Sequence, residues 1–255
     1  MILHAVEAGT GPPVALLHGL FGQAANFGTL QRRLSARFRV IALDLRNHGA
    51  SGHAPVMSYP VLAEDVLETV RARGAWPCAL AGHSMGGKVA MMAALQSPAA
   101  VSRQLVTDIA PVRYQPGLRE LARAMAAIPL HPGLTRAEAD AALAEAVAPE
   151  VRGFLLQNLR FGATPRWRID LAAITAALPA LEDWPEPDAA PYEAPVLFVA
   201  GARSDYIRPE HRPAIRALFP AARLVTVKDA GHWVHADNPA GFAAVTEAFL
   251  AQASG

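Results

Sequence analysis

Short apolar runs alternate along this chain with segments whose apolar residues recur at helical spacing. Parallel strands that are buried on both faces are almost wholly apolar, and helices between them connect one strand to the next. The alternation therefore predicts a mostly parallel β-sheet covered by α-helices. The runs predicted as strands are 14–17, 39–43, 78–81, 104–109, 196–200 and 223–227.

Helices are predicted between these strands. The first apolar stripe at helical spacing consists of Leu30, Leu34 and Phe38. Residues 58–73 begin with Ser-Tyr-Pro, carry an apolar stripe and stop before Gly74, a residue that commonly ends helices. Near the C-terminus, Asn238 as the N-cap and Pro239 in the first turn predict a helix whose buried side is formed by Phe242, Val245 and Phe249.

The alternation breaks in residues 112–192, which contain helical patterns at 135–147 and 150–159 and no clear strand. Thr135, followed three residues later by Glu138, predicts a capping box. We expect an α/β core formed by residues 1–111 and 193–255, with residues 112–192 inserted as a helical cap. Such a cap would cover the carboxyl edge of the sheet, where ligands bind in open α/β folds. An independent helical subdomain is the alternative.

Composition narrows the possible functions. A chain of 255 residues can form one α/β domain or two small ones, and its formal charge of +1 gives no argument for binding to nucleic acid or to an anionic membrane. Cys78 is the only cysteine, which excludes an intramolecular disulfide and a cysteine-based zinc site. No apolar segment approaches membrane-spanning length, and the first residues do not read as a signal peptide. A cytoplasmic protein is expected.

The pentapeptide Gly82-His83-Ser84-Met85-Gly86 follows a predicted strand and precedes a helical pattern. It has the G-x-S-x-G spacing of a nucleophile elbow, in which a serine lies at the tip of a sharp strand-to-helix turn. The flanking glycines permit the strained backbone, and the helix N-terminus directs free N–H groups toward the reacting oxygen. Ser84 is therefore a candidate nucleophile.

Two other interpretations compete for this segment. A glycine-rich strand-to-helix turn can be purely structural. In addition, Gly82 with Gly87 and Lys88 reproduces most of a phosphate-binding P-loop. That motif requires Ser or Thr next, to hold magnesium, and the chain has Val89 there. Because valine cannot bind a metal ion, the hydrolase interpretation is favoured.

A nucleophilic serine needs a base and an oxyanion hole. Of nine histidines, His232 is the best candidate for the base, because it follows the last predicted strand across a short loop. His235 could suggest a metal pair, but the sequence offers no third ligand nearby. His18-Gly19-Leu20 follows the first predicted strand, as an oxyanion loop does. The N–H groups of Leu20 and Met85 would then hold the oxyanion, and His18 would anchor the loop.

These features occur in the order found in α/β-hydrolases, which the chain resembles over essentially its whole length. Residues 44–51 are similar to the D-x-R-x-x-G-x-S loop of that superfamily, which is structural. The segments that resemble the YbfF-type bacterial esterases and their mitochondrial relatives more narrowly are 18–22, 46–49, 82–88, 108–112 and 231–236. The cap matches far less clearly, and the cap usually sets substrate choice.

The acid of the triad has two candidates. In most α/β-hydrolases it stands three residues after the glycine that ends the strand following the cap. Here that position is Ser204, with Asp205 next to it. The YbfF-type branch instead places the acid at the position of Asp108 and a serine at the position of Ser204. We therefore favour Asp108 over Asp205, with Ser204 as an auxiliary group. Asp44 belongs to the structural loop.

The resemblance implies a serine hydrolase that cleaves carboxylic esters without a metal ion or organic cofactor, with acyl thioesters as a further substrate class left open. Lactonase, carbon–carbon bond hydrolase and perhydrolase chemistry use the same triad and stay open, as does a small-molecule receptor that kept only the fold. Residues that could line a substrate pocket, although each is more often part of a core, are Phe27, Met125, Phe161, Trp167 and Trp233. The oligomeric state cannot be read from the sequence.

Overall fold

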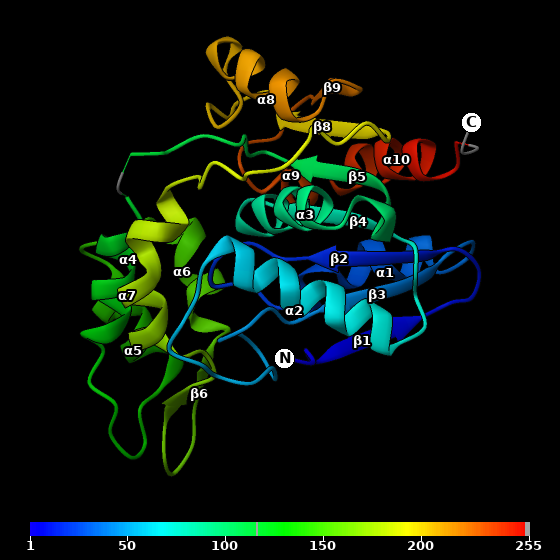
Figure 1. Ribbon diagram of the computed structural model, residues 1–255. Helices are drawn as coiled ribbons and strands as arrows, with labels where there is room; N and C mark the ends of the chain where they lie inside the picture. The colour runs from blue at the N-terminus through cyan, green and yellow to red at the C-terminus, as the bar shows by residue number, and fades with distance from the viewer. Residues whose placement is uncertain (116, 253–255) are drawn as a thin grey trace.

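A seven-stranded sheet with the strand order β1-β3-β2-β4-β5-β8-β9 forms the centre of the molecule (Figure 1). The computed structural model describes residues 1–115 and 117–252, so residues 116 and 253–255 of the predicted cap and core ranges lie outside it. Strand β1 is antiparallel to β3 at one edge, and the other pairs are parallel. The strands are β1 Ala5–Ala8, β2 Pro13–Leu17, β3 Arg39–Leu43, β4 Cys78–His83, β5 Val101–Thr107, β8 Val196–Gly201 and β9 Ala222–Val227.

The predicted mostly parallel sheet is confirmed, and each of the six predicted runs contributes to one of its strands. β4 and β8 are buried at every position, as expected for central parallel strands. Strand β5 begins and ends earlier than predicted, at Val101 and Thr107, so Asp108 and Ile109 lie just beyond its carboxyl end. The edge strand β1 was not predicted, because its four residues are only partly buried or exposed.

Helices cover both faces of the sheet, and the buried apolar residues form two separate clusters. On one face α2 packs against α3, and on the other α1 packs against α10 (Figure 1). The predicted helix at 58–73 is α2, and the predicted C-terminal helix is α10, where Asn238 Oδ1 accepts a hydrogen bond from the Gly241 N–H. The helices outside the insertion are α1 Gly28–Leu34, α2 Tyr59–Ala72, α3 Met85–Gln96, α8 Arg212–Leu218, α9 Val234–Asp237 and α10 Pro239–Leu250, with 3-10 turns η1 Ala24–Phe27, η2 Pro98–Ala100 and η3 Pro209–His211.

Among the residues that the structure describes between β5 and β8, four helices form a group beyond the carboxyl ends of the central strands (Figure 1). They are α4 Leu118–Ala126, α5 Arg136–Leu143, α6 Pro149–Leu156 and α7 Leu171–Glu182. The Thr135–Glu138 capping box is present at the start of α5. This insertion also contains a short antiparallel pair, β6 Leu159–Arg160 with β7 Arg166–Trp167, where the sequence showed no clear strand.

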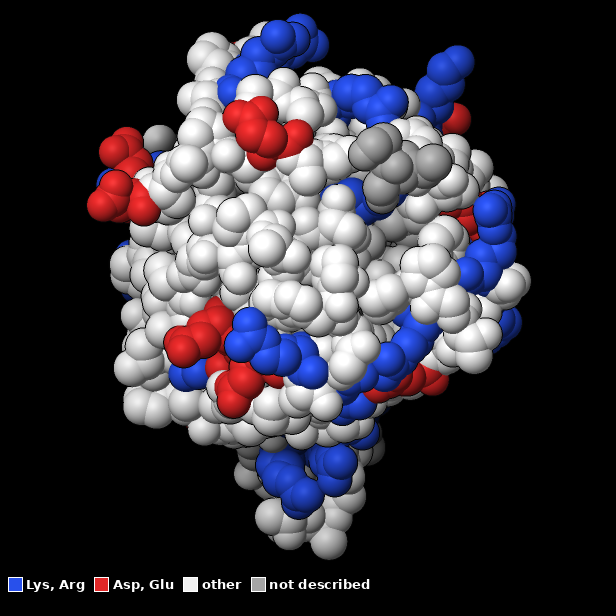
Figure 2. Space-filling model, turned by 45° about the vertical axis from the view of Figure 1, so that its right-hand side comes forward, with Lys and Arg blue, Asp and Glu red and all other residues white. Residues whose placement is uncertain are grey.

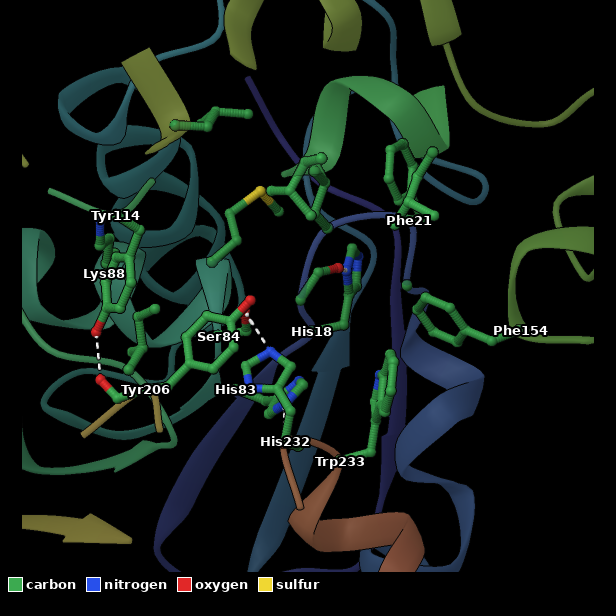
Figure 3. Close-up of a pocket in the computed structure, with 18 of the residues that line it drawn as sticks. His18, Phe21, His83, Ser84, Lys88, Tyr114, Phe154, Tyr206, His232 and Trp233 are labelled. Atoms are coloured by element: carbon green, nitrogen blue, oxygen red, sulfur yellow. Dashed lines mark hydrogen bonds between the residues drawn. The ribbon is translucent and has the colours of Figure 1, made fainter. Parts of the chain in front are cut away.

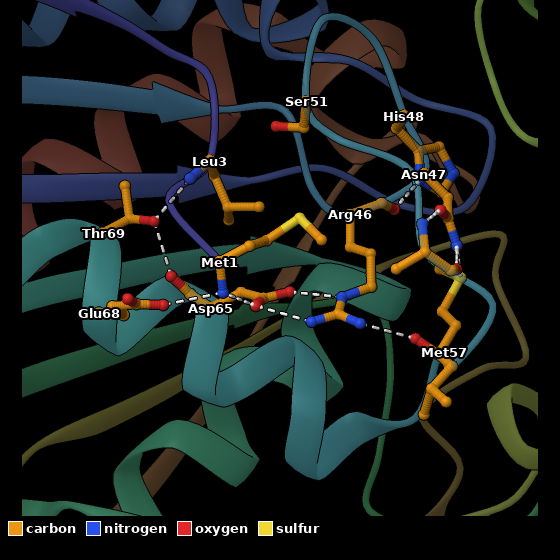
Figure 4. Close-up of polar contacts among 12 residues, drawn as sticks. Met1, Leu3, Arg46, Asn47, His48, Ser51, Met57, Asp65, Glu68 and Thr69 are labelled. Atoms are coloured by element: carbon orange, nitrogen blue, oxygen red, sulfur yellow. Dashed lines mark hydrogen bonds and ion pairs between the residues drawn. The ribbon is translucent and has the colours of Figure 1, made fainter.

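The loop at residues 44–51 is held to helix α2 by a buried ion pair (Figure 4). Arg46 donates to both carboxylate oxygens of Asp65, at 2.7 and 2.9 Å. The Asp65 side chain is 1% exposed, and the N-terminal ammonium of Met1 lies on the same carboxylate. In the same loop, Asp44 accepts hydrogen bonds from the N–H groups of Ala24 and Ala50, in keeping with the expected structural role.

Replacing Arg46 with methionine is expected to lower the free energy of unfolding by about 3 kcal/mol, because a buried carboxylate loses its main partner. Urea denaturation measures the loss. The matched control is Arg33→Met, which removes an exposed arginine paired with Glu247 and should cause a much smaller change. Equal small losses in the two variants would contradict a structural role for the Arg46–Asp65 pair.

Charge is scattered over the face of the molecule that Figure 2 shows. On the face shown in Figure 2, basic and acidic side chains alternate around a broad uncharged area rather than gathering into a field of one sign. This distribution agrees with the small formal charge of +1. Within the described residues, none of the helices has the length and apolar character needed to cross a membrane.

Candidate active site

Ser84 lies at the tip of a sharp turn between β4 and α3, with φ 52° and ψ −121°. A residue with a side chain rarely adopts a positive φ, so this backbone is strained and is held by its surroundings. The neighbouring glycines explain how the turn fits. A Cβ on Gly82 would lie 2.1 Å from the Gly86 carbonyl oxygen, and a Cβ on Gly86 would lie 2.2 Å from that of Leu17. The predicted nucleophile elbow therefore has the geometry its sequence requires.

A continuous line of hydrogen bonds connects three of the candidate residues. The Oγ atom of Ser84 lies 3.0 Å from Nε2 of His232 (Figure 3), and Nδ1 of His232 lies 2.8 Å from Oδ2 of Asp108. Because a buried carboxylate only accepts hydrogen bonds, Nδ1 donates to Asp108, and Nε2 is free to accept from the serine hydroxyl. The Asp108 side chain is fully buried, and that of His232 is 19% exposed.

The two aspartates considered for the acid occupy different environments. Asp108 follows β5 with φ 51° and accepts further hydrogen bonds from the Gly201 N–H, at 3.0 Å, and from the Ser204 hydroxyl. Asp205 lies exposed on the loop after β8. The structure therefore brings Asp108 and Ser204 together with His232, and places Asp205 at the surface.

The loop at residues 18–22 is held by two buried histidines. Nε2 of His18 accepts from the Leu45 N–H, so its Nδ1 donates to the Gly19 carbonyl, at 2.8 Å. His48 accepts from the Phe21 N–H at 3.1 Å. Burial lowers the pKa of His18, and it lowers the pKa of His48 to about 3, which keeps both rings neutral. His18 is thus placed as a loop anchor, and sequence reasoning missed His48, whose partner lies in a distant segment.

A second pair of neutral histidines lies under the His232 loop. His83 contacts the rings of His232 and His235, and its Nε2 lies 2.8 Å from the His232 carbonyl oxygen. Burial lowers the pKa of His83 well below its ordinary value and that of His235 to about 4. No group of three or more histidine, cysteine or acidic side chains in the described residues is arranged to hold a metal ion. His235 instead packs against Phe27.

These buried histidines predict an acid-sensitive fold. Between pH 6.5 and 4 the unfolded chain takes up protons on these residues and the folded protein does not, so the free energy of unfolding falls as the pH is lowered. Each histidine contributes up to about 1.4 kcal/mol per pH unit. Urea denaturation at pH 7, 6 and 5 measures the slope. His48→Gln should reduce it and the exposed His131→Gln should not; an unchanged slope in His48→Gln would refute the assignment.

Lys88, one helical turn after Ser84, does not serve a phosphate site as the P-loop interpretation required. Its buried ammonium donates to the carbonyl oxygens of Val112 and Asp183, both at 2.8 Å. These two residues stand where the chain enters and leaves the inserted helices. Burial lowers the pKa of Lys88 to about 7. The lysine therefore ties both ends of the insertion to the helix that follows the nucleophile.

A tyrosine stacks on His232 and is held in turn by a second tyrosine, and sequence reasoning missed both. The ring of Tyr206 stacks on that of His232, with centroids 3.9 Å apart and an interplanar angle of 21°. The hydroxyl of Tyr114 donates to the Tyr206 carbonyl at 2.6 Å and accepts from the Ala110 N–H (Figure 3). Tyr114 thus connects the start of the insertion to the loop that covers one face of the histidine.

A cavity of about 300 Å³ opens at Ser84. Leu20 and Met85, the two residues expected to form the oxyanion hole, both line it. Among the aromatic and flexible residues considered for a substrate pocket, Phe27 and Trp233 line this cavity. The others, Met125, Phe161 and Trp167, pack in or against the hydrophobic core.

Comparison with known proteins agrees with this architecture. The family model described as alpha/beta hydrolase fold matches residues 12–239. The sn-1-specific diacylglycerol lipase ABHD11 of Mus musculus is 40% identical over 252 residues, covering 95% of this chain and 82% of that protein. Esterase YbfF of Escherichia coli is 35% identical, covering 89% and 88%. A solved marine microorganism esterase has a TM-score of 0.94 and 34% identity, covering 97% of this chain and 99% of its own.

The chain therefore belongs to the α/β-hydrolase family. Within that family it falls in the YbfF-like branch and is a carboxylesterase-type hydrolase that acts on small-molecule esters.

Proposed function

We propose that Ser84, His232 and Asp108 form the catalytic triad of this esterase, and that Ser84 carries the acyl group during turnover. The observation that supports this assignment is the unbroken hydrogen-bonded line from the serine hydroxyl to a buried carboxylate. A serine hydroxyl is a weak nucleophile until an adjacent base accepts its proton. His232 is the base within reach, and Asp108 holds it in the tautomer that can accept.

Acylation begins with attack of Ser84 Oγ on the carbonyl carbon of the ester, while Nε2 of His232 accepts the hydroxyl proton. The carbonyl π electrons move to oxygen and form a tetrahedral oxyanion. His232, now an imidazolium beside the Asp108 carboxylate, gives its proton to the leaving oxygen. The carbon–oxygen bond breaks, the alcohol leaves, and an acyl ester remains on Ser84.

The oxyanion is stabilised by the backbone N–H groups of Leu20 and Met85. Met85 is the first residue of α3, so its N–H has no partner within the helix, and the residue lines the cavity at Ser84. A single donor of this kind typically contributes about 3 kcal/mol to the transition state. The hydrogen bonds of His18 and His48 hold the Leu20 loop in place before substrate arrives.

Deacylation repeats the same steps with water as the nucleophile. His232 takes a proton from water, the hydroxide attacks the acyl carbon, and Ser84 leaves with the returned proton. Ser204 donates to the carboxylate oxygen of Asp108 that also faces His232. This auxiliary bond holds the carboxylate in the orientation that faces His232. The reaction uses only side chains, backbone amides and water.

The substrates proposed are neutral esters with apolar chains, including glycerides. The mouse relative is named as a diacylglycerol lipase, and aromatic and aliphatic side chains make up much of the cavity wall. Acyl thioesters are a second class, because the same attack on a carbonyl carbon cleaves them. Assays of 1,2-dioctanoylglycerol, p-nitrophenyl butyrate and butyryl coenzyme A, followed by acid release in a pH-stat, test the proposal. Hydrolysis of the two oxygen esters supports it, and hydrolysis of none contradicts it.

A further inference from the structure

A second hollow, of about 700 Å³, lies directly against the catalytic cavity. The two spaces share five lining residues, which form a thin wall between them. These residues are Asn26, Phe27, Phe154, Trp233 and His235. Beyond the wall the hollow is bounded by α1, α9 and α10, whose apolar contributions are Leu30, Ala236, Pro239, Ala240, Phe242 and Ala243. The mechanism described above gives this hollow no role.

The wall contains an aromatic pair whose members come from different parts of the fold. Phe154 belongs to α6 of the insertion, and Trp233 follows His232 in the core. Their ring centroids are 6.0 Å apart, and both side chains are only partly buried. In Figure 3 they lie on the side of Ser84 opposite Lys88 and Tyr114. Partly exposed side chains change rotamer quickly, so these two rings can part without any movement of the backbone.

The direction of the leaving group connects the hollow to the reaction. In the proposed mechanism Nε2 of His232 protonates the leaving oxygen, so the alcohol part of the ester must lie against this histidine. Tyr206 stacks on the His232 ring. Trp233 is the next residue, its ring centroid lies 5.8 Å from that of His232, and it forms part of the wall. A chain attached to the leaving oxygen is therefore guided along Trp233 toward the hollow.

We propose that the hollow is a subsite for a long apolar chain on the alcohol part of the ester, reached between Phe154 and Trp233. The inference rests on the proposed function and adds to it the place where a chain on the leaving alcohol binds.

The volumes and linings of the cavity and the hollow support placing the alcohol chain of the ester in the hollow. A volume of about 300 Å³ is at the lower end for ligand pockets, and an ester with chains on both sides needs more room. The hollow supplies that room on an apolar floor. Three charged residues also line it: Arg33 is paired with Glu247, Asp237 accepts a hydrogen bond from the Gly231 N–H, and Glu150 is exposed. The described lining of the hollow thus offers an anionic group no unpaired cation, which suits a neutral occupant. Each methylene that moves from water onto such a surface strengthens binding about fourfold.

Two isomeric esters separate the alcohol side from the acyl side. Decyl acetate and ethyl decanoate contain the same atoms, but the long chain is on the alcohol in the first and on the acid in the second. Ala240→Trp fills the hollow from its exposed wall on α10. This variant is expected to raise the KM for decyl acetate at least tenfold relative to the KM for ethyl decanoate, with kcat for both esters changing far less.

The matched control is Ala248→Trp, an exposed position on the same helix about 12 Å further along. It should leave both KM values within twofold of the wild type. If Ala240→Trp does not fold, Ala236→Trp fills the same hollow from α9. Equal increases for the two isomers, a larger increase for ethyl decanoate, or no change for either overturns the proposal, and so does an effect confined to kcat.

The experiment distinguishes failure of the proposed function from failure of this inference. If the wild type hydrolyses neither isomer and no shorter ester, the esterase mechanism on Ser84 is wrong. If it hydrolyses both, and filling the hollow does not discriminate between them, the mechanism stands and the subsite does not exist. If a partner protein, rather than a substrate chain, occupies the hollow, filling it will likewise fail to discriminate between the two esters.

Discussion

Replacing Ser84 with alanine is expected to lower kcat for p-nitrophenyl butyrate by about a million-fold, as loss of the nucleophile does in other serine hydrolases. Without the hydroxyl, no acyl-enzyme forms, and the oxyanion hole and cavity can only hold the ester near water. The fold should be unaffected, because the substitution removes one oxygen atom and leaves the backbone and the surrounding glycines in place. Initial rates at matched protein concentration, and circular dichroism for folding, provide the measurement.

Ser35→Ala is the matched control for this prediction. Ser35 is partly buried at the end of α1, where its hydroxyl donates to the Arg32 carbonyl, and its loss should leave kcat unchanged. Turnover by Ser84→Ala within a hundredfold of the wild type, in protein free of contaminating esterase, would exclude a mechanism in which Ser84 carries the acyl group.

The second large effect is expected at the acid. Asp108→Asn should lower kcat by about ten-thousand-fold, because an amide can donate to Nδ1 of His232 and so favours the tautomer that cannot accept the serine proton. The Gly201 N–H still meets the amide oxygen, and the amide nitrogen that replaces Oδ2 can donate one hydrogen to His232 and the other to the Ser204 hydroxyl, so the geometry should survive. Steady-state kinetics over pH 6 to 9 measures the loss.

Asp205→Asn is the control for the acid, since Asp205 lies exposed on the neighbouring loop. It is expected to keep kcat within twofold of the wild type. The opposite pattern, with near-normal turnover in Asp108→Asn and collapse in Asp205→Asn, would mean that the loop after β8 rearranges during catalysis and brings Asp205 to His232.

Much of the sheet could be predicted because its central strands are continuous apolar runs. Runs such as 78–81 and 196–200 are buried on both faces in the structure, so their composition is enough to identify them. Strand β1 was not predicted because it lies at an edge of the sheet, where partly exposed residues show no clear apolar pattern. The pair β6–β7 escaped because each strand has only two residues.

The candidate triad residues could be located from the sequence because each lies beyond the carboxyl end of a predicted strand. Ser84 and Asp108 follow adjacent parallel strands, and His232 follows a third by a short loop, so all three reach the same sheet edge. The choice between Asp108 and Asp205 needed a family resemblance, since both follow strands at that edge.

The supporting contacts could not be predicted in the same way. Lys88 binds carbonyls of residues 112 and 183, and Tyr206 receives a hydrogen bond from Tyr114. These partners are far apart in the chain and meet only after the insertion packs on the core. Periodicity and short motifs describe neighbours in sequence, so they carry no signal for such contacts. The hollow behind Trp233 could not be predicted either, because the residues that line it come from separate segments of the chain.

The central claim, that Ser84 is the nucleophile activated by His232 and Asp108, is tested most directly by covalent labelling. A fluorophosphonate probe followed by peptide mass spectrometry reports which side chain is nucleophilic in the folded protein. We predict a single adduct on the peptide that contains Ser84, formed quickly in the wild type, slowly in Asp108→Asn and not at all in Ser84→Ala. An adduct on any other residue, or labelling that persists in Ser84→Ala, would contradict the assignment.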